Sequence, residues 1–401
     1  MELTVKNFRS VREQIIGLAP ITVVYGPNGA GKSTLLYALL TLKNIVLNPN
    51  RDPNGFFNYG FANLGGFQAV VFDHQTKARI GFALTLPSPR EGEETVSYGV
   101  GIGREAAAFT LIVRIGHGDV QLQLPVSFPY PMNQQTQCSI SWMGKPFEVS
   151  WNGITAQTQR KTADPEERLA ADSLLALLNY PLEFLRTIAM VPLKRGFSKP
   201  LYSSVAMSPF VATEDEVATM LASDKYLESK VSQYLEEIFQ RDFRVHVQPG
   251  TAMFSLDSTD RGTKLATELV NEGFGINQVV DLLARSLHQD AKLVCIEEPE
   301  IHLHPTAVRG LARCLADIVA NEGKRFLIST HSEAFLSAFL ALVETGRMKP
   351  NDLACYLAQK KNRATEFERQ ALNEKGQIEG GLTSFIQGEL EDLKILLRVS
   401  E

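Results

Sequence analysis

A glycine-rich segment, GPNGAGKS at residues 26–33, constrains the fold more than any other part of the sequence. It fits the pattern G-x-x-x-x-G-K-[ST], follows the apolar run ITVVY and precedes a helical pattern from Lys32 to about Leu42. In this setting the backbone N–H groups can surround a phosphate, and the helix N-terminus adds partial positive charge. Lys32 can reach the outer phosphates, and the Ser33 hydroxyl can bind Mg²⁺. The segment therefore predicts a nucleotide phosphate loop between a strand and a helix.

The order of the remaining patterns predicts one α/β domain that is split by an insertion. After about residue 261, helical patterns alternate with short apolar strands, which is typical of a mainly parallel sheet flanked by helices. We expect residues 1–90 and 261–401 to form the two halves of this domain. A last helix is expected to begin near Ser384, where Gln387 completes a capping-box pattern.

The intervening residues 91–260 differ in character between their two halves. The first half contains alternating strands with turn signals at residues 116–118 and 144–146, and the second half has helical patterns at about 165–178 and 215–240. The prediction is an antiparallel β lobe followed by a helical insertion.

Composition restricts the class of protein. The 401 residues carry a net charge of −5, with 44% hydrophobic and 21% charged residues, which is ordinary for a soluble globular protein. A strongly basic nucleic-acid-binding protein would look different, although a local basic groove is compatible with this balance. The four cysteines form no CxxC pair, no apolar run is long enough to span a bilayer, and no signal-peptide pattern is present. A cytoplasmic location is the expectation.

Two adjacent acids follow a second apolar strand, in KLVCIEEPEIHLHP. Ligands of open parallel sheets bind at the carboxyl ends of the strands, where Glu297 and Glu298 are expected. Glu297 is assigned to Mg²⁺, directly or through water, and Glu298 to polarising the attacking water. The alternative is that both acids only cap the next helix. Glu300 is expected to be solvated or to act as a cap.

A third strand, in RFLISTHS, also ends in polar residues. His331 at its tip can hydrogen-bond the γ-phosphate or the attacking water, and its pKa makes it responsive to nearby charge. His302 and His304 share a face in HLH, but no third ligand cluster accompanies them, so a subunit contact or local hydrogen bonding is favoured over metal binding.

Gln68 belongs to a weaker candidate, NLGGFQ, which resembles a phosphate-capping motif. The following AVVF has a strand pattern, so no helix dipole is expected to reinforce its amides. Gln68 is therefore interpreted either as a switch glutamine that senses Mg²⁺ and water or as an ordinary strand-edge residue.

The segment LVNEGFGINQ places Gly273 and Gly275 at the start of another amphipathic helix. Free N–H groups at a helix start favour an anion, yet the phosphate loop already has a helix terminus of its own. We therefore expect the helix start at Gly273 and Gly275 to bind the ATP held by a second copy of the chain, with Asn277 adding a contact to the γ-phosphate. A plain glycine turn is the alternative. In a two-fold dimer each nucleotide would then receive one phosphate loop and one such helix.

This order of motifs resembles that of ABC-type ATPases. The opening LTVKNFRSVREQIIGLAPITVVYGPNGAGKSTLLYAL is similar to the amino-terminal segment of SMC and RecF-like ATPases, and IEEPEIHLHP and ISTHS are similar to OLD-family ATPases. The resemblance covers residues 1 to about 45 and about 268 to 345. It departs at the signature segment, which reads NEGFGINQ rather than LSGGQ, and at Glu297, where many relatives have Asp.

The resemblance implies roles for individual residues. It makes Glu297 the Mg²⁺ residue, Glu298 and His331 catalytic together with Lys32, residues 271–278 the signature segment and residues 302–305 a partner-facing segment. The nucleotide cradle would consist of Gly26, Pro27, Asn28, Gly29, Ala30, Gly31, Lys32, Ser33 and Thr34.

The implied activity is Mg²⁺-dependent ATP hydrolysis that drives a head-to-tail homodimer. Such a switch would act on DNA or on an effector protein, such as a nuclease or toxin, in genome maintenance (DNA repair) or antiviral defence against phage. No nuclease activity of the chain itself is expected, because Glu389, Glu391 and Asp392 fit the solvated face of the last helix. A nucleotide-binding subunit of a membrane transporter and a phosphate-loop kinase are the alternatives.

Overall fold

The computed structural model describes residues 1–88, 95–115, 118–131, 133–158, 164–373 and 375–378. The helix expected near Ser384, with Glu389, Glu391 and Asp392, lies outside these ranges. The chain forms two compact units, residues 1–18 with 37–188 and residues 19–36 with 189–401. After the phosphate loop, the chain passes from the second unit back to the first within helix α1 (Thr34–Leu47). No helix within the described ranges has the length and apolarity needed to cross a membrane.

The first unit contains a six-stranded antiparallel sheet in the order β2-β1-β4-β5-β6-β7. Its strands are β1 (Glu2–Phe8), β2 (Val11–Gly17), β4 (Ile80–Pro87), β5 (Thr95–Ile102), β6 (Ala106–Ile115) and β7 (Gly118–Ser127). Buried and partly exposed residues alternate along β4 and β5, as expected for a sheet with one covered face. The expected domain boundary at residue 90 therefore falls inside this sheet, because strands from both sides of it pair with each other.

A smaller sheet and a long helix complete the first unit. The sheet has the order β10-β9-β8, formed by β8 (Thr136–Trp142), β9 (Lys145–Trp151) and β10 (Ala156–Thr158), and the helix is α3 (Pro165–Arg186). The indole of Trp142 donates to Ser173 on α3 over 2.7 Å, which satisfies two buried polar groups at once. Both expected hairpins are present, although residues 116–117 at the tip of the first lie outside the described ranges.

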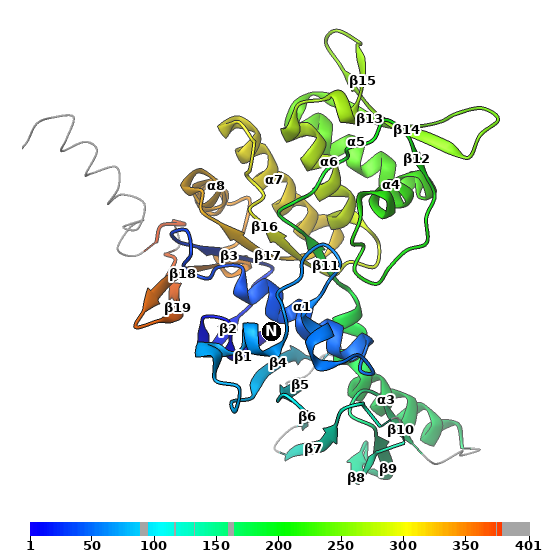
Figure 1. Ribbon diagram of the computed structural model, residues 1–401, viewed down its shortest axis with the longest axis vertical. Coiled ribbons are helices and arrows are strands. Elements are labelled where there is room, and N and C mark those ends of the chain that lie inside the picture. The colour runs from blue at the N-terminus through cyan, green and yellow to red at the C-terminus, as the bar shows by residue number, and fades with distance from the viewer. Residues whose placement is uncertain (89–94, 116–117, 132, 159–163, 374, 379–401) are drawn as a thin grey trace, which may run out of the picture. The chain divides into compact units, whose positions relative to one another are not determined.

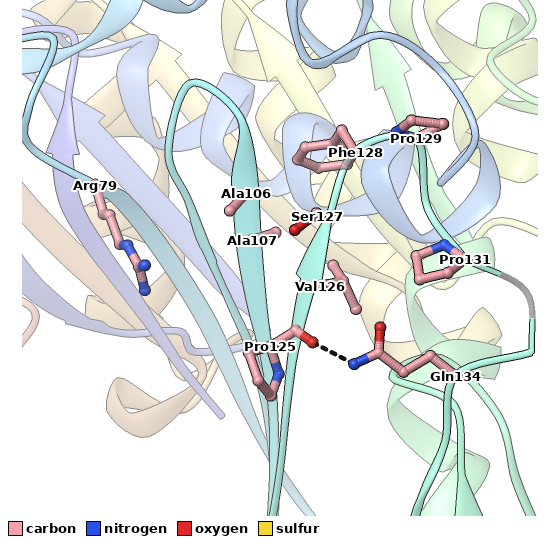
Figure 2. A pocket seen from close by; sticks show the side chains of 10 residues that line it. All are labelled: Arg79, Ala106, Ala107, Pro125, Val126, Ser127, Phe128, Pro129, Pro131 and Gln134. Atoms are coloured by element: carbon pink, nitrogen blue, oxygen red, sulfur yellow. Dashed lines mark hydrogen bonds between the residues drawn. The ribbon is translucent and has the colours of Figure 1, made fainter.

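The first unit also has a cavity of about 410 Å³ beside Arg79 and the neighbouring ends of β6 and β7 (Figure 2). Its lining is mainly small apolar groups and prolines, and the amide of Gln134 donates to the Pro125 carbonyl at its rim. No cluster of titratable groups lines it.

The second unit is built on a six-stranded sheet in the order β11-β16-β17-β3-β18-β19. Its strands are β3 (Ile21–Tyr25), β11 (Ile188–Val191), β16 (Leu293–Glu297), β17 (Arg325–Thr330), β18 (Leu353–Lys361) and β19 (Ala364–Gln370). The pairs β16–β17, β17–β3 and β3–β18 are parallel, and β19 is antiparallel. Strand β3 is buried along its whole length, which is typical of a parallel sheet covered on both faces. The expected α/β fold is confirmed.

Three helices pack on this sheet: α6 (Phe274–Leu287), α7 (Pro305–Glu322) and α8 (Glu333–Glu344). Figure 1 shows them above β16, β17 and β3, and α7 packs against α8. Helix α6 buries Val279, Val280 and Leu283 in the same core as Val294 and Ile296 of β16. The start of α6 is therefore fixed by burial of its apolar stripe.

The segment expected as one helix at 215–240 is two helices, α4 (Glu214–Ser223) and α5 (Lys225–Phe239). Asp224 between them has extended backbone angles, and its carboxylate accepts from the N–H groups of Tyr226 and Leu227. An Asp N-cap competes with helix continuation, which explains the break.

Four short strands join these two helices to form a lobe of the second unit. They are β12 (Tyr202–Ser203), β13 (Arg241–Val247), β14 (Met253–Asp260) and β15 (Ala266–Glu268), and all pair antiparallel. Helix α5 packs against β13, and the side chains of Ser232 and Glu228 accept from the N–H groups of Phe243 and Val245. At the outer edge of β13, these side chains therefore bond the backbone N–H groups that a further strand would otherwise bond. The lobe packs against α6 and α7 and so belongs to the second unit.

Candidate functional site

The phosphate loop follows β3 and leads into α1, as the sequence predicts. Gly26, Gly29 and Gly31 have φ angles of 144°, 76° and 94°, which L side chains rarely adopt. At Gly26 a Cβ would also lie 2.4 Å from the carbonyl oxygen of Ala358 on β18. The glycines are therefore required by the path of the backbone.

Lys32 folds back over this loop. Its ammonium donates to the carbonyls of Gly26 over 3.1 Å and Pro27 over 3.3 Å, and only 6% of the residue is exposed. It also lies 3.6 Å from a carboxylate oxygen of Glu298. The lysine is thus held at the loop, within reach of the catalytic acid that the sequence predicts.

The rest of the predicted cradle is divided between exposed and buried positions. Pro27, Asn28 and Gly29 are exposed at the tip, whereas Ala30 and Thr34 are buried. The hydroxyl of Thr365 on β19 donates to the Ala30 carbonyl over 2.7 Å, so the hairpin of β18 and β19 supports the loop.

The acidic pair lies at the carboxyl end of β16, beside the ends of β17 and β3. Glu297 is in register with Ser329, and Thr330 with Tyr25, so three strands end at one sheet edge. The N–H of Glu298 donates to the Ser329 carbonyl over 2.9 Å, and Glu298 has a φ of 45°. A positive φ is unfavourable for a residue with a Cβ, and it marks a sharp turn immediately after the strand.

Glu298 is the centre of a compact polar cluster with Lys32 and His331. One carboxylate oxygen faces Lys32, and the other accepts from the backbone N–H of His331 over 3.1 Å and contacts its ring nitrogen Nδ1 closely. His331 remains half-exposed, so its ring can still contact a bound molecule. The structure therefore brings together the three residues that the sequence assigns to catalysis.

Glu300 belongs to the same cluster, which corrects the expectation that it is solvated. It is 8% exposed, and its Oε1 accepts from the Thr330 hydroxyl over 2.5 Å and from the His331 N–H over 3.2 Å. Burial, with the neighbouring Glu298 carboxylate in addition, raises the pKa of Glu300 to about 7. Sequence reasoning missed it because an acid in a turn is ordinarily solvated.

The donor set fits Mg²⁺. The Ser33 hydroxyl and the Glu297 carboxylate are hard oxygen ligands of the type that Mg²⁺ prefers, and both belong to segments that meet at this sheet edge. Across the described ranges, one group of three metal-ligating side chains lies close together, namely Glu298, Glu300 and His331. His302 and His304 are not part of it, and the His304 ring instead accepts from the Thr306 N–H as the N-cap of α7.

Gln68 lies in the first unit, on the four-residue helix α2 (Phe67–Val70). The strand expected at AVVF is therefore wrong. The Asn54 side chain accepts from the Phe67 N–H over 2.9 Å, so a segment distant in sequence satisfies one of the free N–H groups at the start of this helix. The Gln68 side chain is exposed.

The helix α6 begins at the predicted glycines. Gly273 is its N-cap and carries no side-chain cap, and a Cβ on Gly275 would lie 2.9 Å from the His302 carbonyl oxygen. Phe274 is 74% exposed, and its ring lies 5.6 Å from that of His302. The signature segment and the predicted partner-facing segment therefore contact each other within one chain.

Asn277 does not face outward as expected. It is 7% exposed. Its side-chain oxygen accepts from the Phe197 N–H over 2.6 Å, and its side-chain NH₂ group donates to the backbone carbonyls of Phe197 and Leu269. The expected γ-phosphate contact is therefore corrected, because position 277 falls on the buried side of α6.

Arg195 is a site residue that the sequence did not reveal. Its two terminal nitrogens donate to the carbonyls of Glu297 and Glu298, each over 2.8 Å. It stands about a hundred residues upstream of the acids in a loop without a motif, so only tertiary structure brings it to the site.

Two segments match known domain families. Residues 2–61 match a family described as "AAA domain", and residues 200–337 match one described as "AAA domain, putative AbiEii toxin, Type IV TA system". The chain is similar to an OLD nuclease of Thermus scotoductus, at 23% identity over 350 residues. The match covers 83% of this chain but only 59% of the relative, so the chain spans less than two thirds of that protein.

The fold is similar to that of SMC head domains. One solved SMC head, bound to the C-winged helix domain of ScpA, aligns with a TM-score of 0.51 at 11% identity, over 93% of this chain and 98% of that chain. The head domain from Thermotoga maritima aligns over 92% of this chain and 98% of that chain, at 11% identity and a TM-score of 0.43. The two segments are thus similar to AAA domains, the chain is similar in sequence to an OLD nuclease, and its fold is similar to that of an SMC head.

Proposed function

We propose that the chain binds Mg²⁺-ATP at the phosphate loop and hydrolyses it. The observation that carries this proposal is the contact of Glu298 with both Lys32 and His331 at the edge where β3, β16 and β17 end. When ATP binds, the Lys32 ammonium would leave the loop carbonyls and donate to phosphate oxygens instead. Glu298 would then accept a proton from the attacking water. His331 would hold Glu298 in place and contact the γ-phosphate. Mg²⁺ supplies charge neutralisation of the phosphates, with Ser33 and Glu297 as its ligands.

ATP would be shared by two copies arranged head to tail. The start of α6 is a helix N-terminus without a side-chain cap, and the exposed Phe274 lies beside it. Backbone N–H groups at such a terminus favour a phosphate. The signature segment of one copy would thus close over the nucleotide in the phosphate loop of the other, with Gly273 and Gly275 contributing backbone contacts.

The biological role would be a nucleotide-dependent switch in a DNA-related process. Similarity to an OLD nuclease supports this direction, and the shared SMC head fold is compatible with it. An effector protein, such as a nuclease or a toxin, would sense the ATP-bound dimer in repair or antiviral defence.

The proposal is tested by Glu298→Gln, which keeps the size of the side chain but removes its basicity. With Mg²⁺-ATP, wild-type protein should release phosphate, and the variant should accumulate as a dimer in light scattering because closure is retained and hydrolysis is lost. The matched control is Glu333→Gln, which removes an acid on the first turn of α8. This variant should hydrolyse ATP at the wild-type rate. A variant that stays monomeric with ATP would contradict the head-to-tail dimer, and a wild type without phosphate release would contradict the ATPase.

The DNA-related role has its own test. Binding of duplex DNA should strengthen when Glu298→Gln protein is supplied with ATP, and it should weaken with added salt because phosphate contacts release counterions. Equal DNA binding with and without ATP would contradict an ATP-dependent role on DNA and would favour a protein effector as the target of the switch.

A further inference from the structure

The loop at residues 192–198, here called the strap, contacts both the catalytic turn and helix α6. At the catalytic turn, the guanidinium of Arg195 bridges two successive carbonyls, those of Glu297 and Glu298, over 2.8 Å each. The same guanidinium also donates to the Pro192 carbonyl over 3.0 Å, which fixes its position within the strap. A φ of 45° is unfavourable for Glu298 by itself. The planar guanidinium of Arg195, with its two hydrogen bonds, stabilises this turn.

The two residues after Arg195 attach the strap to α6. The N–H and carbonyl of Phe197 form a closed pair of hydrogen bonds with the Asn277 side chain, over 2.6 Å and 2.8 Å. The N–H of Gly196 donates to Asp281 over 3.3 Å. A Cβ on Gly196 would lie 2.5 Å from Asn277 Oδ1, and its φ is 106°, so only glycine permits this approach.

A buried ion pair holds the α6 side of this connection. Asp281 is fully buried and pairs with Arg285 over 2.6 Å on the same helix. Arg285 in turn donates to the Val211 carbonyl, ahead of α4. Because this buried ion pair is also bonded to the Gly196 N–H and the Val211 carbonyl, it favours one position of α6 relative to the strap.

We propose that Arg195 is a positioning residue for Glu298, and that the strap couples the start of α6 to the catalytic turn of the same chain. This inference rests on the head-to-tail dimer proposed above. In that dimer, α6 of one copy contacts the ATP held by the partner, whereas the catalytic turn of that copy acts on its own ATP. The strap therefore connects the two ATP sites, and closure at one site sets the position of Glu298 at the other.

The first test is Arg195→Lys, since an ammonium group cannot reproduce the planar fork over two carbonyls. We expect kcat to fall about tenfold or more, because small displacements of a catalytic group are costly, while KM for ATP changes little. ATP-dependent dimerisation of the Arg195→Lys/Glu298→Gln double variant should persist. The matched control is Lys194→Ala, which removes the adjacent, exposed cation and should leave kcat unchanged. An unchanged kcat in Arg195→Lys would overturn the positioning role.

The second test addresses coupling through Asn277→Ala, which removes the hydrogen bonds to Phe197 without touching Arg195. The rate of wild-type hydrolysis should depend cooperatively on ATP concentration, whereas the variant should show a Hill coefficient near one. The melting temperature of the variant is measured in parallel, to confirm that it is folded. A wild type that dimerises and hydrolyses ATP without cooperativity would overturn the coupling. A wild type that neither dimerises nor hydrolyses ATP would instead refute the proposed function, so the two failures are distinguishable.

Discussion

At the scale of single residues, the site depends on acids whose environments differ although they are neighbours in sequence. Glu298 contacts a lysine and a histidine at the sheet edge, whereas Glu300 is buried and accepts from Thr330 and the backbone of His331. The Glu298 carboxylate lies close enough to Glu300 to disfavour a charge on Glu300. Burial raises the pKa of Glu300 to about 7, so at neutral pH it holds its proton in a large fraction of molecules.

This raised pKa makes stability depend on pH. The unfolded chain releases the Glu300 proton near its ordinary pKa of 4.5, whereas the folded chain keeps it until about pH 7. The contribution of Glu300 to stability is therefore complete below about pH 4.5 and is lost as pH rises through 7, by up to about 3 kcal/mol. Glu300→Gln stays neutral and escapes this loss. Its melting temperature relative to wild type should therefore rise between pH 5 and pH 8.

The control for this measurement is Glu344→Gln, which removes an exposed carboxylate at the end of α8. Its difference from wild type should stay nearly constant over the same pH range. A constant difference for Glu300→Gln as well would show that Glu300 titrates normally in the folded protein.

At the scale of elements, the start of α6 shows that two glycines only two positions apart have unequal roles. A Cβ on Gly275 would meet the His302 carbonyl oxygen at 2.9 Å and Leu303 Cδ2 at 3.0 Å, whereas a Cβ on Gly273 would meet nothing within 4 Å. Gly275 thus permits close packing of α6 on the segment that precedes α7, and Gly273 leaves its N–H group accessible as the N-cap.

Gly275→Leu should therefore abolish ATP hydrolysis while ATP binding persists. The side chain displaces α6 or the segment at His302, but the phosphate loop lies on other elements and stays intact. Binding is measured by titration with a fluorescent ATP analogue and hydrolysis by phosphate release. Gly273→Ala is the matched control, because its Cβ has space and its N–H remains. Equal loss of hydrolysis in both variants would contradict the steric argument.

At the scale of the whole molecule, the proposed dimer divides each ATP site between two chains. A chain with a damaged phosphate loop still carries an intact signature helix, and the reverse holds for a chain with a damaged helix. A two-fold dimer of two different variants then contains one site made entirely of wild-type segments.

Mixing Lys32→Ala protein with Gly275→Leu protein should therefore restore hydrolysis that neither shows alone. At equal concentrations about half of the dimers are mixed, with one such site each, so recovery is expected to reach at most roughly a quarter of the wild-type rate. Recovery falls below a quarter to the extent that the displaced α6 shifts Glu298 of its own chain through the strap. The measurement is steady-state phosphate release as a function of mixing ratio. Activity equal to the sum of the two separate variants would show that each chain completes its own site.

The sequence by itself was sufficient for the local parts of this protein. The glycine pattern at residues 26–33 requires a particular backbone path, and the apolar strands before Glu297 and His331 direct those residues to one edge of a parallel sheet. The start of helix α6 follows from local periodicity, so its position in the chain was predictable to within a few residues.

Only tertiary structure decided which residues complete the site and how the chain divides into units. The burial of Glu300, the inward turn of Asn277 and the fork of Arg195 depend on contacts between segments up to about a hundred residues apart. The pairing of β4 with β5 likewise carries the first sheet across the boundary expected at residue 90. Periodicity reports whether a residue lies on a buried face, but it does not report which distant segment covers that face. This is why the motif residues were predictable, and the residues that position them were not.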